Sequence, residues 1–285
     1  MPFSSTLEYQ RHAPTATTAP SAPVVVLLHG LFGHISNLNQ CANALRTLGF
    51  ETLSISLPGH GHSPLEQSFD FIDTAQQLEQ LRQHLDIKKW SLVGHSLGGK
   101  VAMTYAQCYP NACQALVVAD IAPVAYERRH DVILKALSQF NLQAVTQRSD
   151  AIRQLEHAGV DAGTAAFICK HLVRHATPFQ TPAFSWQLAI PTLVESYPAI
   201  IAALPTQPPY LGPVLLLKGQ RSDYLQDHHR AAILARFPKA KAHIIAGAGH
   251  MLHVEKTAQF NTTVGRFLLQ HVATETQTAA MGSNK

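Results

Sequence analysis

A serine between two glycines stands in residues 94–98, where the sequence GHSLG has the pattern Gly-x-Ser-x-Gly. The apolar run WSLV precedes it and the helix-like run KVAMTYAQCY follows it, so Ser96 is predicted at a strand-to-helix turn. Glycines at 94 and 98 allow such a strained turn to pack closely, which leaves the hydroxyl exposed above a sheet. The pattern indicates a nucleophilic serine. Glycines that only close a tight turn are the non-catalytic alternative.

His250 is the candidate base that would activate this serine. A serine hydroxyl is a poor nucleophile unless a base accepts its proton. His250 follows the last predicted strand and precedes the last predicted helix, which is where the chain order Ser, Asp, His places the base. His253, one turn further on, is the alternative base.

Two main-chain N–H groups are the candidate donors for an oxyanion hole. Attack on an acyl carbonyl creates an oxyanion, which preorganised donors must stabilise. Leu97, directly after the serine, would supply one donor. Leu31, in the glycine-bounded segment HGLFG at residues 29–33, would supply the second.

Short β-branched apolar runs alternate with helical patterns along the chain, which predicts an α/β fold. The runs are apolar on both faces and lie about 25–40 residues apart, as expected of a mostly parallel sheet covered by helices on both faces. The expected strands are residues 24–30, 52–57, 90–96, 115–120, 214–219 and 242–247. The expected helices are residues 38–48, 71–85, 101–109 and 254–270.

The alternation breaks between residues 122 and 209, which predicts an insertion. Its first part is helical in pattern, and its second part is dense in proline and aromatic residues. We therefore expect a core domain at residues 1–121 and 210–273, a cap at 122–209 over the carboxyl edge of the sheet, and a disordered tail at 274–285.

Composition excludes several classes of protein. Apolar residues make up 46% of the 285 residues and charged residues 14%, which allows a large core and excludes global disorder. The net charge of +4 comes from scattered residues, so no nucleic-acid partner is expected.

Cysteine usage and hydropathy indicate the compartment. The four cysteines form no Cys-x-x-Cys pair, which favours a reducing environment. Because the first residues lack signal-peptide features and no window approaches 18 apolar residues, we expect a cytoplasmic protein without stable membrane insertion. The sequence is compatible with a monomer and with a dimer.

These motifs together resemble the α/β-hydrolases, and more narrowly the small bacterial YbfF-type esterases and their mitochondrial abhydrolase relatives. The resemblance covers most of the chain, and the segment ADIAPVAYERRH is typical of the narrower group. It rests on HGLFG (29–33), LPGHGHS (57–63), GHSLGGK (94–100), ADIAPVAYERRH (119–130), residues 184–200, KGQRSDYL (218–225) and AGAGHMLHVE (246–255). The resemblance implies hydrolysis of carboxylic esters, and of thioesters by some members, with no cofactor.

The acid of the triad has two candidates. The usual superfamily position, three residues after Gly219, is occupied by Ser222, and Asp223 follows it. The resembled group also carries serine there and uses the aspartate after the preceding strand, which corresponds to Asp120. The resemblance therefore implies Asp120 as the acid with Ser222 in support, while Asp223 is the alternative and a helix cap is the non-catalytic explanation for Asp120.

Other residues are weaker candidates. His29, Phe32, Trp186 and Tyr197 are expected in the substrate pocket, although the aromatic residues would equally suit the core of the cap. The pair His60 and His62 has metal-like spacing, yet no third ligand lies nearby in the sequence and the resembled group uses no metal here, so no metal site is expected.

We therefore expect a serine carboxylesterase that acts on short- to medium-chain acyl esters, which are small molecules. The alternatives are an acyl thioesterase or C–C bond hydrolase of the same fold, and a non-catalytic protein that binds a small molecule in the same pocket.

Overall fold

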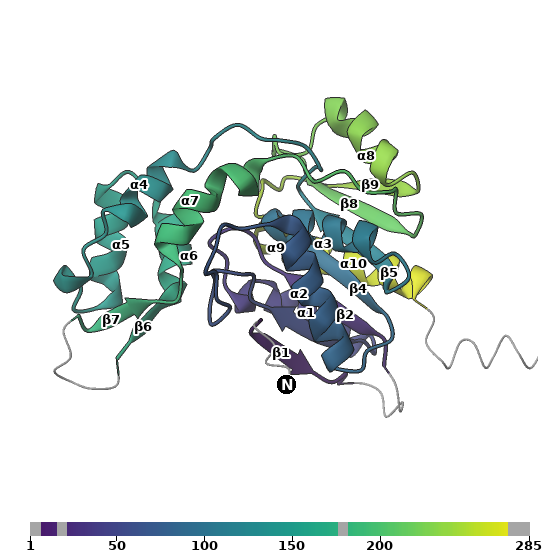
Figure 1. The fold of residues 1–285 in the computed structure, drawn as a ribbon, viewed down its shortest axis with the longest axis horizontal. Coiled ribbons are helices and arrows are strands. Elements are labelled where there is room, and N and C mark those ends of the chain that lie inside the picture. The colour runs from purple at the N-terminus through teal and green to yellow at the C-terminus, as the bar shows by residue number, and fades with distance from the viewer. Residues whose placement is uncertain (1–6, 16–21, 176–181, 273–285) are drawn as a thin grey trace, which may run out of the picture.

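The computed structural model describes residues 7–15, 22–175 and 182–272. In this part of the chain the main sheet has seven strands (Figure 1), all parallel except β1, which pairs antiparallel with β3. Across the sheet the strands are β1 (Tyr9–His12), β3 (Glu51–Ile55), β2 (Val24–Leu28), β4 (Trp90–His95), β5 (Cys113–Ala119), β8 (Val214–Gly219) and β9 (Ala240–Ile245).

The sheet is buried between two layers of helices because its central strands are apolar on both faces. In β2, Val25 and Leu27 face one core, and Val26 and Leu28 face the other. One core includes residues of α1 (Asn39–Thr47) and α10 (Thr257–His271), and the other includes residues of α2 (Phe71–His84), α3 (Leu97–Cys108) and α8 (Arg230–Arg236). This arrangement confirms the predicted mostly parallel sheet with helices on both faces.

Several predicted boundaries were wrong. The strand β1 was not predicted, because its sequence YQRH is polar and it lies at the sheet edge. The strand β9 is the other edge, so most of its residues are exposed although it was predicted as buried. The helix expected at residues 101–109 already begins at Leu97, and the last helix is divided into α9 (Leu252–Glu255) and α10 because Lys256 has a non-helical φ of −137°.

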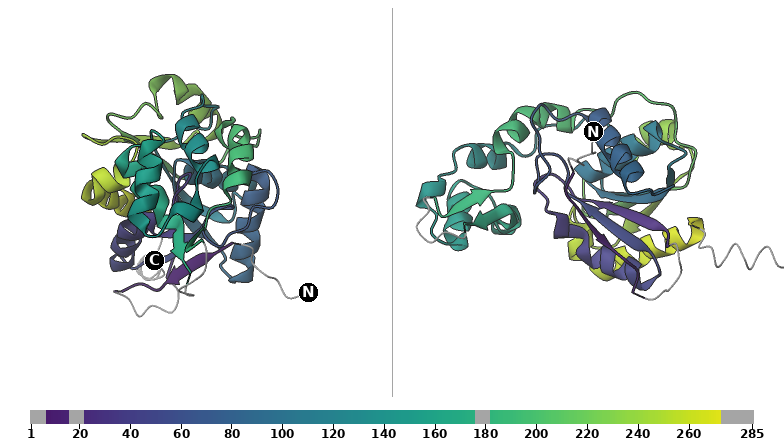
Figure 2. Two further views of the ribbon diagram at one scale, coloured as in Figure 1. Left: turned by 90° about the vertical axis from the view of Figure 1, so that its left-hand side faces the viewer. Right: turned by 60° about the horizontal axis from the view of Figure 1, so that its bottom comes forward.

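The chain between β5 and β8 forms a separate group of elements. Figures 1 and 2 show α4, α5, α6 and a small antiparallel sheet set to one side of the main sheet, with α7 leading back to it. The bounds are α4 (Asp131–Ser138), α5 (Arg148–His157), α6 (Ala162–Ile168), β6 (Leu172–Arg174), β7 (Phe184–Trp186) and α7 (Ile190–Ile201), with 3-10 turns at Leu142–Ala144 and Cys169–His171. Further 3-10 turns lie at Ile35–Leu38 and Asp227–His229.

Two further observations concern membrane-spanning helices and the tail of the chain. None of the helices in the described ranges has the length and apolar character needed to cross a membrane. The tail predicted at residues 274–285 lies outside the described residues.

Candidate active site

Ser96 lies at a sharp turn between β4 and α3, at the carboxyl end of the sheet. Its φ of 51° and ψ of −117° are unusual for a residue with a side chain, and such strain is concentrated at functional sites. The turn requires glycine on both sides. A Cβ atom at Gly94 would lie 2.2 Å from the Gly98 carbonyl oxygen, and one at Gly98 would lie 2.3 Å from the carbonyl oxygen of Leu28. The Gly-x-Ser-x-Gly pattern therefore reflects the close backbone packing that holds Ser96 in this turn.

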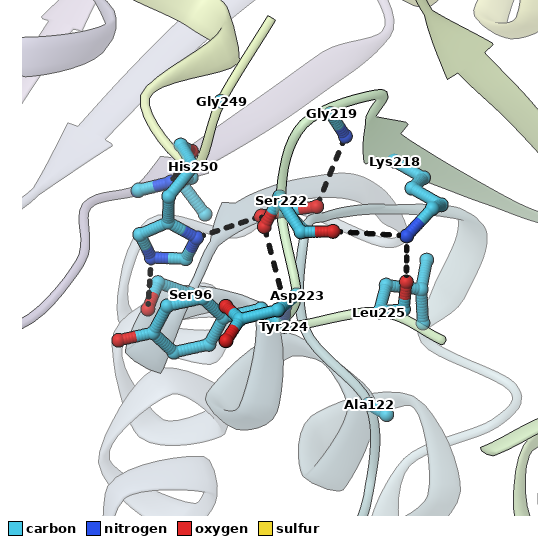
Figure 3. Close-up of polar contacts among 12 residues, drawn as sticks. Ser96, Ala122, Lys218, Gly219, Ser222, Asp223, Tyr224, Leu225, Gly249 and His250 are labelled. Carbon is cyan, nitrogen blue, oxygen red and sulfur yellow. Dashed lines mark hydrogen bonds and ion pairs between the residues drawn. The ribbon is translucent and has the colours of Figure 1, made fainter. Parts of the chain in front are cut away.

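A line of hydrogen bonds joins Ser96 to His250 and His250 to Asp120. Figure 3 shows the contact between Ser96 and His250. The distance from His250 Nδ1 to Asp120 Oδ2 is 2.7 Å, and the distance from His250 Nε2 to Ser96 Oγ is 3.1 Å. Because a carboxylate can only accept, Nδ1 carries the proton and Nε2 is free to accept the serine proton. The arrangement has the polarity required for base-activated nucleophilic attack.

Asp120 is fully buried and has a φ of 56°. Its Oδ1 accepts a hydrogen bond from the Gly219 N–H (3.0 Å), and its Oδ2 accepts one from the Ser222 hydroxyl as well as from His250. The predicted support by Ser222 therefore corresponds to a direct contact with the carboxylate.

Asp223 does not contact His250. Its side chain is 63% exposed and forms an ion pair with Arg129 at 2.7 Å. The alternative acid is thus turned toward solvent, because it follows Ser222 in a turn in which the Ser222 N–H donates to the Gly219 carbonyl.

Two aromatic side chains hold the loop of His250. His95 Nε2 donates to the carbonyl oxygen of His250 (2.9 Å). Tyr224 stacks on the His250 ring with a centroid distance of 3.8 Å and an angle of 18° (Figure 3). Neither was assigned from the sequence, although both lie within the quoted motifs. His253, the alternative base, is buried against His95, and burial lowers its pKa to about 4, so it is not placed to serve Ser96.

Leu31 and Leu97 both line the cavity beside Ser96. Leu97 is the first residue of α3, where a helix leaves its N–H groups without an internal partner. Leu31 lies in the turn after β2, where its N–H has no partner among the described residues. The structure thus places both predicted main-chain donors next to the serine.

The cavity encloses about 390 Å³, including its open side. Of the described residues of the inserted segment, those that line the cavity lie toward its two ends, within residues 126–130 and 197–201. The lining residues are Leu31, Ser96, Leu97, Lys100, Ile121, Tyr126, Glu127, Arg129, His130, Tyr197, Ile200, Ile201 and Tyr224. Most of these side chains are apolar or aromatic, as expected of a pocket for a small organic molecule.

Lys100 is a buried cation in the wall of this cavity that was not predicted from the sequence. Its Nζ donates to the carbonyl oxygens of Ala202 (2.5 Å), Ile201 (3.2 Å) and Ile200 (3.4 Å) at the end of α7. It also lies 5.2 Å from the ring centroid of Tyr126. Burial lowers the pKa of Lys100 to about 7. The lysine therefore ties the helix that follows Ser96 to the end of the inserted segment.

Of the four predicted pocket residues, Tyr197 lines the cavity and the other three do not. His29 is buried between loops, where it accepts from the Leu57 N–H (3.1 Å). Phe32 is buried with its ring edge against His130. Trp186 packs on Phe140 at 5.0 Å within the inserted segment. These three side chains serve packing and loop contacts instead, because His29 hydrogen-bonds a neighbouring loop and Phe32 and Trp186 pack against other rings.

His60 and His62 diverge in the structure. His60 is fully buried, whereas His62 is exposed. The part of the chain that the structure describes contains no group of three or more His, Cys, Asp or Glu side chains arranged to hold a metal ion.

Comparison with known proteins identifies the family of the chain. The chain is 32% identical over 257 residues to the esterase YbfF of Escherichia coli (strain K12), which covers 90% of this chain and 97% of that protein. It is 32% identical over 253 residues to the sn-1-specific diacylglycerol lipase ABHD11 of Mus musculus, over 86% of this chain and 81% of that protein. A solved structure described as a marine microorganism esterase superposes with a TM-score of 0.85 at 28% identity, over 92% of this chain and 99% of that one. The model of the alpha/beta hydrolase fold family matches residues 23–257, and the chain belongs to that family.

Proposed function

We propose that this protein is a serine carboxylesterase that hydrolyses short- to medium-chain acyl esters through an acyl-enzyme intermediate. The observation that carries the proposal is the continuous hydrogen-bonded line from Ser96 through His250 to the buried Asp120, with the serine in the wall of the cavity. The similarity of the chain to an esterase and to a diacylglycerol lipase supports an ester as substrate.

The first half of the reaction forms the acyl-enzyme. Ser96 Oγ attacks the acyl carbonyl carbon while His250 Nε2 takes the serine proton, and the carbonyl oxygen becomes an oxyanion that the N–H groups of Leu31 and Leu97 stabilise. Asp120 stabilises the imidazolium. When the tetrahedral intermediate collapses, the C–O bond to the alcohol breaks, and the alcohol leaves with the proton from His250.

The second half releases the acid. A water molecule gives a proton to His250 and attacks the acyl carbon, and the bond to Ser96 Oγ then breaks as the serine recovers its proton. The inserted segment acts as a cap whose two ends wall the cavity. The wall of apolar and aromatic side chains from both the main sheet region and the two ends of the inserted segment supports a substrate with a short to medium acyl chain.

The test is a comparison of the wild-type protein and the Ser96→Ala variant on p-nitrophenyl esters of graded chain length and on a medium-chain diacylglycerol. Ser96→Ala should lower kcat by more than about 10³-fold, because the hydroxyl supplies the covalent step and little packing. A wild-type protein that binds these esters without releasing p-nitrophenol would favour a non-catalytic binding protein. Faster turnover of matched thioesters would favour a thioesterase.

A further inference from the structure

The turn that carries Leu31 is held in a strained conformation. The Gly33 N–H donates to the Gly30 carbonyl oxygen (2.9 Å), which closes a turn over residues 30–33. Phe32, the third residue of the turn, has a φ of 57°. A residue with a side chain rarely adopts this left-handed conformation, and it persists only where surrounding contacts hold it. The contacts that hold this turn therefore control where the Leu31 N–H points.

His60 supplies the first of these contacts. Its Nε2 accepts a hydrogen bond from the Phe32 N–H (3.0 Å). Because Nε2 is the acceptor, the ring proton is on Nδ1, which donates to the Pro58 carbonyl oxygen (3.0 Å). His60 is fully buried, so the Phe32 N–H has no access to water as an alternative partner.

His171 supplies the second contact from the inserted segment. Its Nε2 donates to the carbonyl oxygen of Gly33 (2.9 Å), and its side chain is also fully buried. The ring centroids of His60 and His171 are 6.0 Å apart. The two histidines thus form hydrogen bonds with the same turn, His60 as the acceptor and His171 as the donor.

The inserted segment also holds the loop of His60. The Gly61 N–H donates to the Gln187 carbonyl oxygen (2.8 Å), and the Ala189 N–H donates to the Gly59 carbonyl oxygen (2.9 Å). The Gln187 N–H in turn donates to the carbonyl oxygen of His171 (2.8 Å). A continuous set of hydrogen bonds therefore runs from the inserted segment through both histidines to the turn beside Ser96.

We propose that His60 and His171 are positioning residues that fix the turn at residues 30–33 so that the Leu31 N–H faces the acyl oxyanion. The inference rests on the proposed function, because it assigns a task within the same reaction. The Phe32 N–H belongs to the peptide plane that follows Leu31. Loss of its acceptor frees this plane to rotate, which displaces the Leu31 N–H on the other side of the Leu31 Cα atom. Neither histidine touches the substrate.

The experiment compares leucine and glutamine at each position. Glutamine offers both an amide oxygen that can accept from Phe32 and an amide N–H that can donate to Gly33, whereas leucine offers neither. His62→Leu is the matched control, because His62 is an exposed histidine in the same loop. Each variant is assayed for kcat and KM on p-nitrophenyl butyrate and for inhibition by a trifluoromethyl ketone. Attack of Ser96 on this ketone forms a hemiketal whose oxyanion occupies the proposed hole.

We expect His60→Leu and His171→Leu to lower kcat by about 10- to 100-fold, less than the about 10²–10³-fold loss when an oxyanion donor is removed. Inhibition by the ketone should weaken by a similar factor while KM changes less than about threefold, because the effect lies in the transition state. The glutamine variants and His62→Leu should remain near wild type. If one leucine variant does not fold, the pair at the other position gives the same comparison.

Two results would overturn the inference. In the first, the folded leucine variants keep both kcat and inhibitor affinity within about threefold of wild type, so that the turn needs neither histidine. In the second, glutamine and leucine lose activity equally, so that the histidines only fill space. Failure of the proposed function would look different, because wild-type protein would then not hydrolyse the ester, or Ser96→Ala would hydrolyse it at the wild-type rate.

Discussion

Replacing Asp120 by asparagine should lower kcat by about two to four orders of magnitude with little change in KM. The magnitude follows from the contacts of the carboxylate. Asp120 accepts from the Gly219 N–H, the Ser222 hydroxyl and His250 Nδ1, and an asparagine has only one oxygen for these three donors. If that oxygen stays on Gly219, the amide N–H faces His250 Nδ1. The imidazole must then carry its proton on Nε2, where it can no longer accept the proton of Ser96.

Two matched variants separate this effect from a general loss of charge. Asp223→Asn removes an exposed ion pair with Arg129, which is worth about 1 kcal/mol or less, and should lower kcat by less than about tenfold. Ser222→Ala leaves the carboxylate in place and removes one of its donors, so its effect should fall between those of the two aspartate variants.

The assay is steady-state and burst kinetics on p-nitrophenyl butyrate, with circular dichroism and thermal unfolding to show that each variant folds. Asp120 is not the acid of the triad if Asp223→Asn loses most of its kcat while Asp120→Asn, shown to be folded, keeps a nearly normal kcat. That outcome would mean that the acid of the triad lies in the loop after β8, which is its usual place in the superfamily.

Three further predictions concern the pocket, stability and the cap. Ile201→Phe should shift the chain-length profile on p-nitrophenyl esters toward shorter chains, because Ile201 lines the cavity, whereas Trp186→Ala should leave the profile unchanged. Urea unfolding should show stability lost as the pH falls from about 6.5 to about 4, by at most about 1.4 kcal/mol per pH unit for each of four buried histidines. Burial lowers the pKa of His60, His130 and His253 from the ordinary value of 6.5 to about 4, and that of His171 to about 3. As the pH falls, these histidines therefore bind protons in the unfolded chain before they do so in the folded protein. Constant stability over this pH range would contradict the prediction. Lys100→Met should lower the free energy of unfolding by about 1–3 kcal/mol, because carbonyl groups at the end of α7 lose their donor, and an unchanged urea midpoint would contradict this role.

The central part of the fold could be predicted because it depends on local sequence. Strands buried on both faces are apolar throughout, as in β2 and β4, so their positions are visible as continuous runs. The edge strands do not follow this rule. The strand β1 is polar and β9 is largely exposed, since each has a neighbour on one side only.

The part of the candidate site that depends on residues adjacent in the sequence could be predicted. The glycines at 94 and 98 mark the turn at Ser96 because a Cβ atom at either would collide with backbone. The contacts of His60 and His171 could not be predicted, because they join segments far apart in the sequence. The sequence left open whether Trp186 lines the pocket or packs within the cap, because an aromatic residue looks alike in both roles; in the structure it packs on Phe140.

Mass spectrometry of the protein after reaction with a fluorophosphonate tests most directly whether Ser96 is a nucleophile activated by His250. We expect one adduct per chain, on the peptide that contains Ser96, formed with loss of fluoride and in step with the loss of esterase activity. His250→Ala should react at least about 10²-fold more slowly, because the serine then keeps its proton. Ester hydrolysis that continues after Ser96 is fully modified, or an adduct on another residue that accounts for the inactivation, would contradict the proposed mechanism.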